Sequence, residues 1–233
     1  MLRREAKKLK NISKRQNGDL RRKQIVLTLR KIIIKYGSEN VTVKKLAEEI
    51  GFSGGALYRH FKSKREVLLL LVEDLQENLE RDLKKDSPGK NPLERLRNIA
   101  DSLLSSTEQK KGVIFLVIAE IISLGDRELN GKIFEVLDGF LSHIKHLITV
   151  GINTGEIRED IDVDMAALTF FGMLQGLVTI WSLKGFPSML KLKNKEMWEF
   201  YHKGIKQEGI NSSAKRQAGY LHFATGIEPI KAL

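Results

Sequence analysis

Cysteine is absent from this sequence of 233 residues. Its absence excludes disulfides, thiolate nucleophiles and cysteine-ligated zinc sites. A chain without cysteine fits a reducing compartment. Residues 1–35 also lack the continuous apolar run that a secretory signal needs. We therefore expect a cytoplasmic protein.

Recognisable catalytic motifs are missing as well. The sequence has no G-x-x-x-x-G-K-[ST] phosphate loop and no H-E-x-x-H zinc motif. His143 and His146 lie three positions apart, but they have no obvious third ligand for a metal. We expect neither an enzyme, nor a metal site, nor a cofactor.

The alternation of apolar and polar residues that marks β-strands is also absent, and apolar residues recur instead at three- and four-residue steps. This periodicity predicts an all-α protein. Gly, Pro and capping residues divide it into helices, which we expect over residues 20–36, 43–50, 53–61, 64–85, 92–106, 112–124, 126–153, 162–183 and 188–207.

Positive charge is concentrated in the first third of the chain. Residues 1–70 hold 19 Lys and Arg against 6 Asp and Glu, a net charge of +13, whereas residues 71–233 carry −2. A basic segment joined to a nearly neutral one suggests a polyanion-binding head on a body with another task. The alternative is a solvated basic surface without a partner.

The segment 43–61 has the pattern of a helix-turn-helix, in which a second short helix enters the DNA major groove. Gly51 lies in the bend, and Gly54 and Gly55 leave the backbone N–H groups of the next helix open to a phosphate. One helical turn then supplies a phenol, a guanidinium and an imidazole, from Tyr58, Arg59 and His60.

The chain resembles the TetR family of transcriptional repressors over about residues 20–70. The clearest match is the segment 41–68, V-T-V-K-K-L-A-E-E-I-G-F-S-G-G-A-L-Y-R-H-F-K-S-K-R-E-V-L. By this resemblance Thr42 and Lys64 clamp phosphates, and Ala56 stands where many members have Ser or Thr. The full set of DNA contacts that we predict is Thr42, Lys44, Ser53, Gly54, Gly55, Ala56, Tyr58, Arg59, His60, Lys62 and Lys64.

The resemblance implies four segments: a basic mobile arm (1–19), a three-helix helix-turn-helix DNA-binding domain (20–68), a helical ligand-binding and dimerisation domain (69–207), and a loosely packed tail (208–233). It also implies a homodimeric repressor that binds double-stranded DNA at a palindromic operator and is released by a small apolar effector. The alternative is a helix-turn-helix DNA-binding protein without an effector.

Apolar residues in the second domain could line the family's ligand pocket, although such residues are more often plain core. Glu120 stands on an apolar helix and needs either a cationic ligand, solvent or a lysine partner. The candidate pocket residues are Phe115, Ile118, Glu120, Ile122, Phe134, Leu137, Phe140, Leu141, Phe170, Phe171, Leu174 and Gln175.

Residues 165–183 contain no charge over 19 positions, long enough for a membrane span. Two glycines, a glutamine and several hydroxyls favour burial against a partner subunit instead, so we expect no membrane association. In the family the last two long helices pair with a second subunit. The predicted dimer contacts are Met165, Leu168, Gly172, Gly176, Thr179, Trp181, Met197, Trp198 and Tyr201.

Overall fold

A computed structural model describes residues 21–51, 57–58, 61–84, 91–186 and 190–207. These ranges contain helices and no β-strand, and one isolated bridge joins Ile157 to Lys206. The predicted all-α fold is confirmed. After a helix over residues 21–36 come η1 (Ser38–Asn40), α2 (Val43–Ile50), α4 (Lys64–Lys84), α5 (Pro92–Gln109), α6 (Val113–Leu124), α7 (Arg127–Asn153), α8 (Val163–Leu183) and α9 (Leu190–Ile205).

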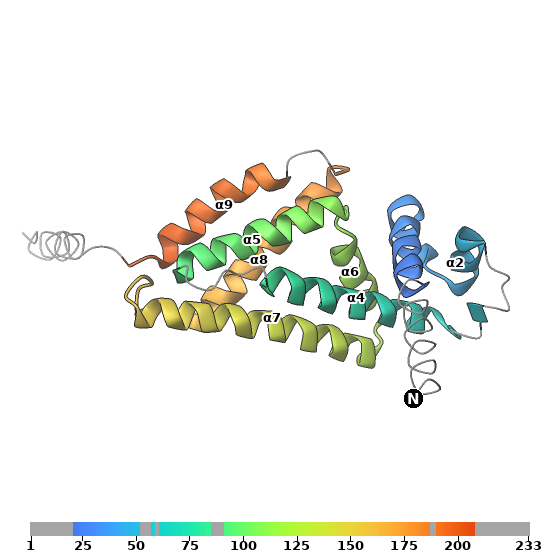
Figure 1. The fold of residues 1–233 in the computed structure, drawn as a ribbon, viewed down its shortest axis with the longest axis horizontal. Helices are drawn as coiled ribbons and strands as arrows, with labels where there is room; N and C mark the ends of the chain where they lie inside the picture. Colours follow the sequence, from blue (N-terminus) through green and yellow to red (C-terminus); the bar gives the residue numbers. More distant parts are fainter. Residues whose placement is uncertain (1–20, 52–56, 59–60, 85–90, 187–189, 208–233) are drawn as a thin grey trace, which may run out of the picture.

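The molecule has a head and a body (Figure 1). The helix over 21–36 and α2 form the head at one end, and α4 leads from the head into the body. The long helices α5, α7, α8 and α9 make up most of the body, while α6 lies beside α4 near the head. The predicted arm (1–19) and tail (208–233) lie outside the described residues.

The head is held together by the apolar stripe that the sequence predicts on its first helix. Ile25, Val26, Leu29, Ile32 and Ile33 are all buried. They belong to one cluster with apolar residues of α2, of the segment before α4 and of α4 itself. Burial of this stripe fixes the first helix against the helix-turn-helix segment.

Local capping chemistry determines where the head's helices begin and end. The Thr42 hydroxyl accepts a hydrogen bond from the Lys45 amide at 3.0 Å and so caps α2. At the start of α4, the Ser63 hydroxyl accepts from the Glu66 amide at 3.4 Å, and the Glu66 carboxylate accepts from the Lys62 amide at 2.8 Å. This is close to the capping box predicted from S-x-x-E.

Gly51 ends α2 in the left-handed region, with φ at 78°. A Cβ atom added there would meet nothing within 4 Å, so the cost of Gly51→Ala is conformational. We expect this variant to lose about 1–2 kcal/mol of unfolding free energy in a urea titration. The matched control is Gly131→Ala inside α7, also without a neighbour within 4 Å, which should gain roughly 0.5–1 kcal/mol. Equal effects of the two substitutions would contradict this account.

Two apolar clusters make up the core, and α4 contributes to both. The first joins the head to the near half of α4 and to parts of α6 and α7. The second lies within the body, among α5, α7, α8 and α9, and Leu79 of α4 packs against both clusters. The predicted division between residues 68 and 69 therefore falls inside one continuous helix.

Helix α8 is long and apolar enough to cross a membrane by length and composition. In the structure it packs against α7 and α9 through one face. That face consists of buried residues at helical spacing: Ala167, Phe170, Leu174, Val178 and Trp181. Its opposite face is exposed.

Candidate DNA-binding surface and ligand cavity

The head presents polar and basic side chains beside the helix-turn-helix. Thr42 and Lys44 on the α2 side are exposed, as is Lys62. Tyr58 is 49% exposed, whereas its neighbour Leu57 is buried against the head's core. Leu57 thus packs into the head while the Tyr58 side chain faces solvent. Ser53, Gly54, Gly55, Ala56, Arg59 and His60 lie outside the described residues.

Lys64, a predicted phosphate contact, is engaged within the protein. Its ammonium lies 2.5 Å from a carboxylate oxygen of Glu120 on α6. This hydrogen bond, aided by one to Ser38, lowers the pKa of Glu120 below its usual value. Of the partners considered for Glu120, the structure thus shows a lysine. Glu120 is not among the residues that line the apolar cavity of the body.

The next residue of α4 is also tied to the body. The Arg65 guanidinium bonds the Asp126 carboxylate at 2.9 Å and also pairs with Glu128. Asp126 is at the same time the N-cap of α7, accepting from the amides of Glu128 and Leu129. Two successive basic residues at the start of α4 therefore meet acids from α6 and from the start of α7.

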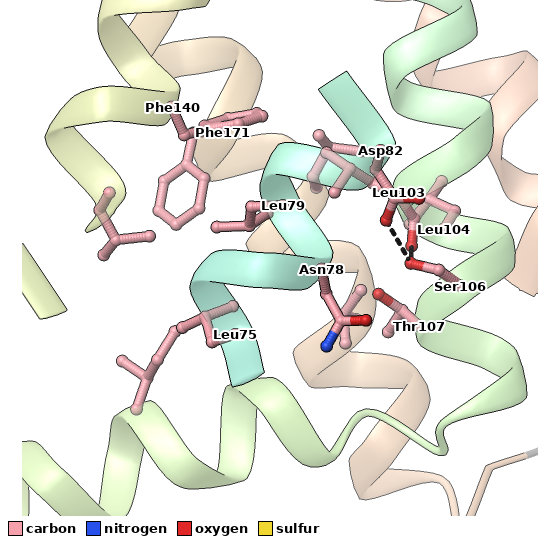
Figure 2. Close-up of a pocket in the computed structure, with 14 residues that line it drawn as sticks. Leu75, Asn78, Leu79, Asp82, Leu103, Leu104, Ser106, Thr107, Phe140 and Phe171 are labelled. Carbon is pink, nitrogen blue, oxygen red and sulfur yellow. Dashed lines mark hydrogen bonds between the residues drawn. The ribbon is translucent and has the colours of Figure 1, made fainter. Parts of the chain in front are cut away.

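The body contains an apolar cavity enclosed by α4, α5, α6, α7 and α8 (Figure 2). Its volume is about 40 Å³, enough for a few water molecules at roughly 10–15 Å³ each. The residues that line it are Leu75, Asn78, Leu79, Asp82, Leu103, Leu104, Ser106, Thr107, Ile118, Leu137, Phe140, Phe171, Leu174 and Val178.

Polar groups gather on the wall between α4 and α5, and Phe140 and Phe171 lie on the other side of α4 (Figure 2). The buried Asp82 carboxylate accepts hydrogen bonds from Ser102 at 3.1 Å and from Ser106 at 2.9 Å. These hydroxyls stabilise the charged carboxylate inside the body. The cavity is therefore apolar with one hydrogen-bonding side.

Two basic residues bond to Asn78 on the polar side of the cavity. The Asn78 side-chain oxygen accepts from Arg81 at 3.0 Å and from the Lys110 ammonium at 2.8 Å. Burial lowers the pKa of Lys110, and the positive charge of Arg30 lowers it further. A ligand group on this side would meet both a carboxylate and a network of donors.

Some of the residues predicted for the ligand pocket line the cavity, and others do not. Ile118, Leu137, Phe140, Phe171 and Leu174 line the cavity. The others that can be placed are outside its lining: Ile122 and Phe134 are 65% and 68% exposed, Phe170 is buried in the core, and Glu120, Leu141 and Gln175 lie elsewhere. The Phe115 side chain is outside the described residues.

Sequence reasoning missed the contribution of α4 and α5 to the cavity. Leu75, Asn78, Leu79 and Asp82 occupy positions i, i+3, i+4 and i+7 of α4, which lie on one face. That spacing puts an amide and a carboxylate on an apolar face. The signal available in the sequence was the presence of polar residues within an apolar helical stripe.

The outer face of α8 exposes apolar side chains, and Phe200 of α9 lies beside it. Met165 and Leu168 are 55% and 49% exposed, and Phe200 of α9 is 75% exposed. Gly172 and Gly176 are also exposed, and a Cβ atom at either would meet nothing within 4 Å. Of the other predicted dimer contacts, Thr179 is exposed and Met197 half-buried, while Trp181, Trp198 and Tyr201 are buried inside the protomer.

A basic helix-turn-helix head on a helical body with an internal cavity defines the class, a DNA-binding regulator of transcription. The family described as bacterial regulatory proteins, tetR family, matches residues 25–71, and the YsiA-like protein C-terminal region matches residues 65–204. The chain belongs to the TetR family of bacterial regulators.

Known relatives agree with this assignment. The fatty acid metabolism regulator protein of Bacillus subtilis is 30% identical over 162 residues, covering 68% of this chain and 81% of the relative. The structure of FadR from Bacillus subtilis in complex with stearoyl-CoA has a TM-score of 0.69 at 27% identity, covering 78% and 98% of the two chains.

The ketosteroid regulator KstR2 of Mycobacterium tuberculosis shares the fold. Its TM-score is 0.67 at 22% identity, and the match covers 81% of this chain and 96% of that structure. The two Bacillus subtilis relatives are both regulators by name.

Proposed function

We propose that this protein is a homodimeric repressor whose affinity for a palindromic operator falls when a mainly apolar ligand enters the body. The observation that carries the proposal is the position of the cavity. Its walls include α4, which packs into the head's core and pairs with the first helix through Asp74 and Arg30, and α6, which contacts η1. A ligand in the cavity therefore presses on the elements that hold the DNA-reading surface.

The size of the cavity supports such a coupling. A volume of about 40 Å³ cannot contain a drug-sized molecule. A ligand would have to separate the surrounding helices, and it would therefore bind a different conformation from the one described. Differential affinity for two conformations is the requirement for a ligand to shift DNA binding.

The lining suits an apolar ligand with one hydrogen-bonding group. Leucine and phenylalanine side chains dominate the walls, and the polar side is confined to α4 and α5. The acyl chain and thioester carbonyl of a long-chain acyl-CoA combine these properties, and the Bacillus subtilis relative was solved with stearoyl-CoA. We take stearoyl-CoA as the first probe.

The operator should be sought by footprinting DNA that flanks the protein's own coding region, and its binding measured by fluorescence anisotropy. Stearoyl-CoA should weaken that binding by about 5- to 150-fold, whereas coenzyme A alone should not. Leu104→Trp, which fills the cavity, should reduce the response at least about tenfold, and Leu104→Met should retain it.

The outcomes separate the two parts of the proposal. Salt-dependent protection of a symmetric site without any response to stearoyl-CoA would favour a regulator without this effector. Failure to protect any fragment would overturn the operator itself.

A further inference from the structure

Helix α6 connects the body to the head at two points. The carboxylate of its Glu120 accepts a hydrogen bond from Lys64 at the start of α4, and α6 also contacts η1, which contains Ser38. The side chains of Lys64 and Glu120 are 29% and 15% exposed, so the pair is only partly screened by water. Helix α6 is thus placed against both ends of the helix-turn-helix.

Lys64 occupies a position from which it could neutralise a phosphate. It follows the predicted second helix of the helix-turn-helix (residues 53–61) by three residues. Lys62, two residues before it, is exposed. The two lysines differ in their partners, because the Lys64 ammonium is held by a carboxylate at 2.5 Å. An ammonium held in this way must give up that interaction before it can bind DNA.

Helix α6 places the pair within reach of the cavity. Ile118 lines the cavity, and Glu120 lies two positions further along the same 12-residue helix. Two positions correspond to roughly 200° around a helix, so the two side chains point in nearly opposite directions. A shift of α6 at the cavity wall would therefore move Glu120 relative to Lys64.

We propose that Glu120 is a positioning residue that competes with DNA phosphate for Lys64 and so lowers the operator affinity of the protein. The inference rests on the proposed function, because it requires an operator. It adds an internal competitor to that function, because the Glu120 carboxylate binds the Lys64 ammonium in place of DNA phosphate. The strength of this ion pair depends on the position of α6.

The test measures operator affinity against salt concentration for Glu120→Gln, Lys64→Ala and the double variant. Glu120→Gln should bind about three- to tenfold more tightly. Lys64→Ala should have little effect alone, but combined with Glu120→Gln it should abolish the gain and flatten the salt slope by about 0.9. An equal effect of Lys64→Ala with either residue at position 120 would overturn the proposal.

Glu128→Gln is the matched control for charge. It removes one negative charge from the same junction, while Arg65 keeps its bond to Asp126. Its operator affinity should stay within about twofold of the wild type. A gain as large as that of Glu120→Gln would show a general charge effect and overturn the specific role of Glu120.

A comparison of two lysines keeps the test valid if Glu120→Gln fails to fold. Lys62→Ala should weaken binding and flatten the salt slope more than Lys64→Ala does, because only Lys62 is free of the carboxylate. A larger effect of Lys64→Ala would contradict the inference. Absence of operator binding by the wild type would instead overturn the proposed function.

Discussion

A variant with both Leu168→Arg and Phe200→Arg should stay folded, lose self-association and bind a full operator about 10²- to 10⁴-fold more weakly. The two side chains are 49% and 75% exposed, so their replacement leaves the protomer's core intact. A two-fold interface brings identical surfaces together, so each new charge acts twice. A monomer would read a single half-site.

Light scattering after size-exclusion chromatography measures the association, and anisotropy measures operator binding. Phe134→Arg provides the matched control, because Phe134 is 68% exposed but lies on α7. That variant should behave as the wild type. A double arginine variant that remains dimeric would remove the α8 and α9 face from the proposed interface.

The second large effect concerns stability. Phe170→Ala should lower the free energy of unfolding by about 3–5 kcal/mol. Phe170 is fully buried on the inner face of α8, and its ring centroid lies 5.4 Å from that of Tyr201 on α9. Truncation would leave a cavity between these helices and remove an aromatic contact.

Urea unfolding at one fixed protein concentration measures this loss, because association alters apparent stability. Phe134→Ala, at an exposed position of α7, should change the free energy by less than about 0.5 kcal/mol. A loss below about 1 kcal/mol for Phe170→Ala would show that the body repacks around the gap.

The helices that the structure describes could be predicted from the sequence because their signals are local. Thr42, Ser63, Asp126 and Asp162 all cap helices at positions that capping chemistry favours. The bounds of α2 match the prediction of residues 43–50, and its closing glycine has the left-handed backbone expected there. These features depend on neighbours within a few residues.

Long-range pairing could not be predicted in the same way. Lys64 and Glu120 are 56 residues apart, and nothing local to either specifies the other. The predicted interface residues show a second limit. Trp181 and Trp198 were predicted as dimer contacts because they are apolar and lie on these helices, but they are buried within one protomer. Subunit cores and protomer cores use similar residues, so composition alone does not separate them.

Helix α4 has a consequence for exchanging parts between regulators of this kind. Its near half packs with the head, whereas Leu75, Asn78, Leu79 and Asp82 form part of the cavity wall. In a hybrid joined after Lys84, this wall would come from the parent that supplies the DNA-reading head. The remaining walls of the cavity would come from the other parent. DNA preference and ligand preference are therefore not separate cassettes, and a functional graft needs α4 redesigned to suit both parents.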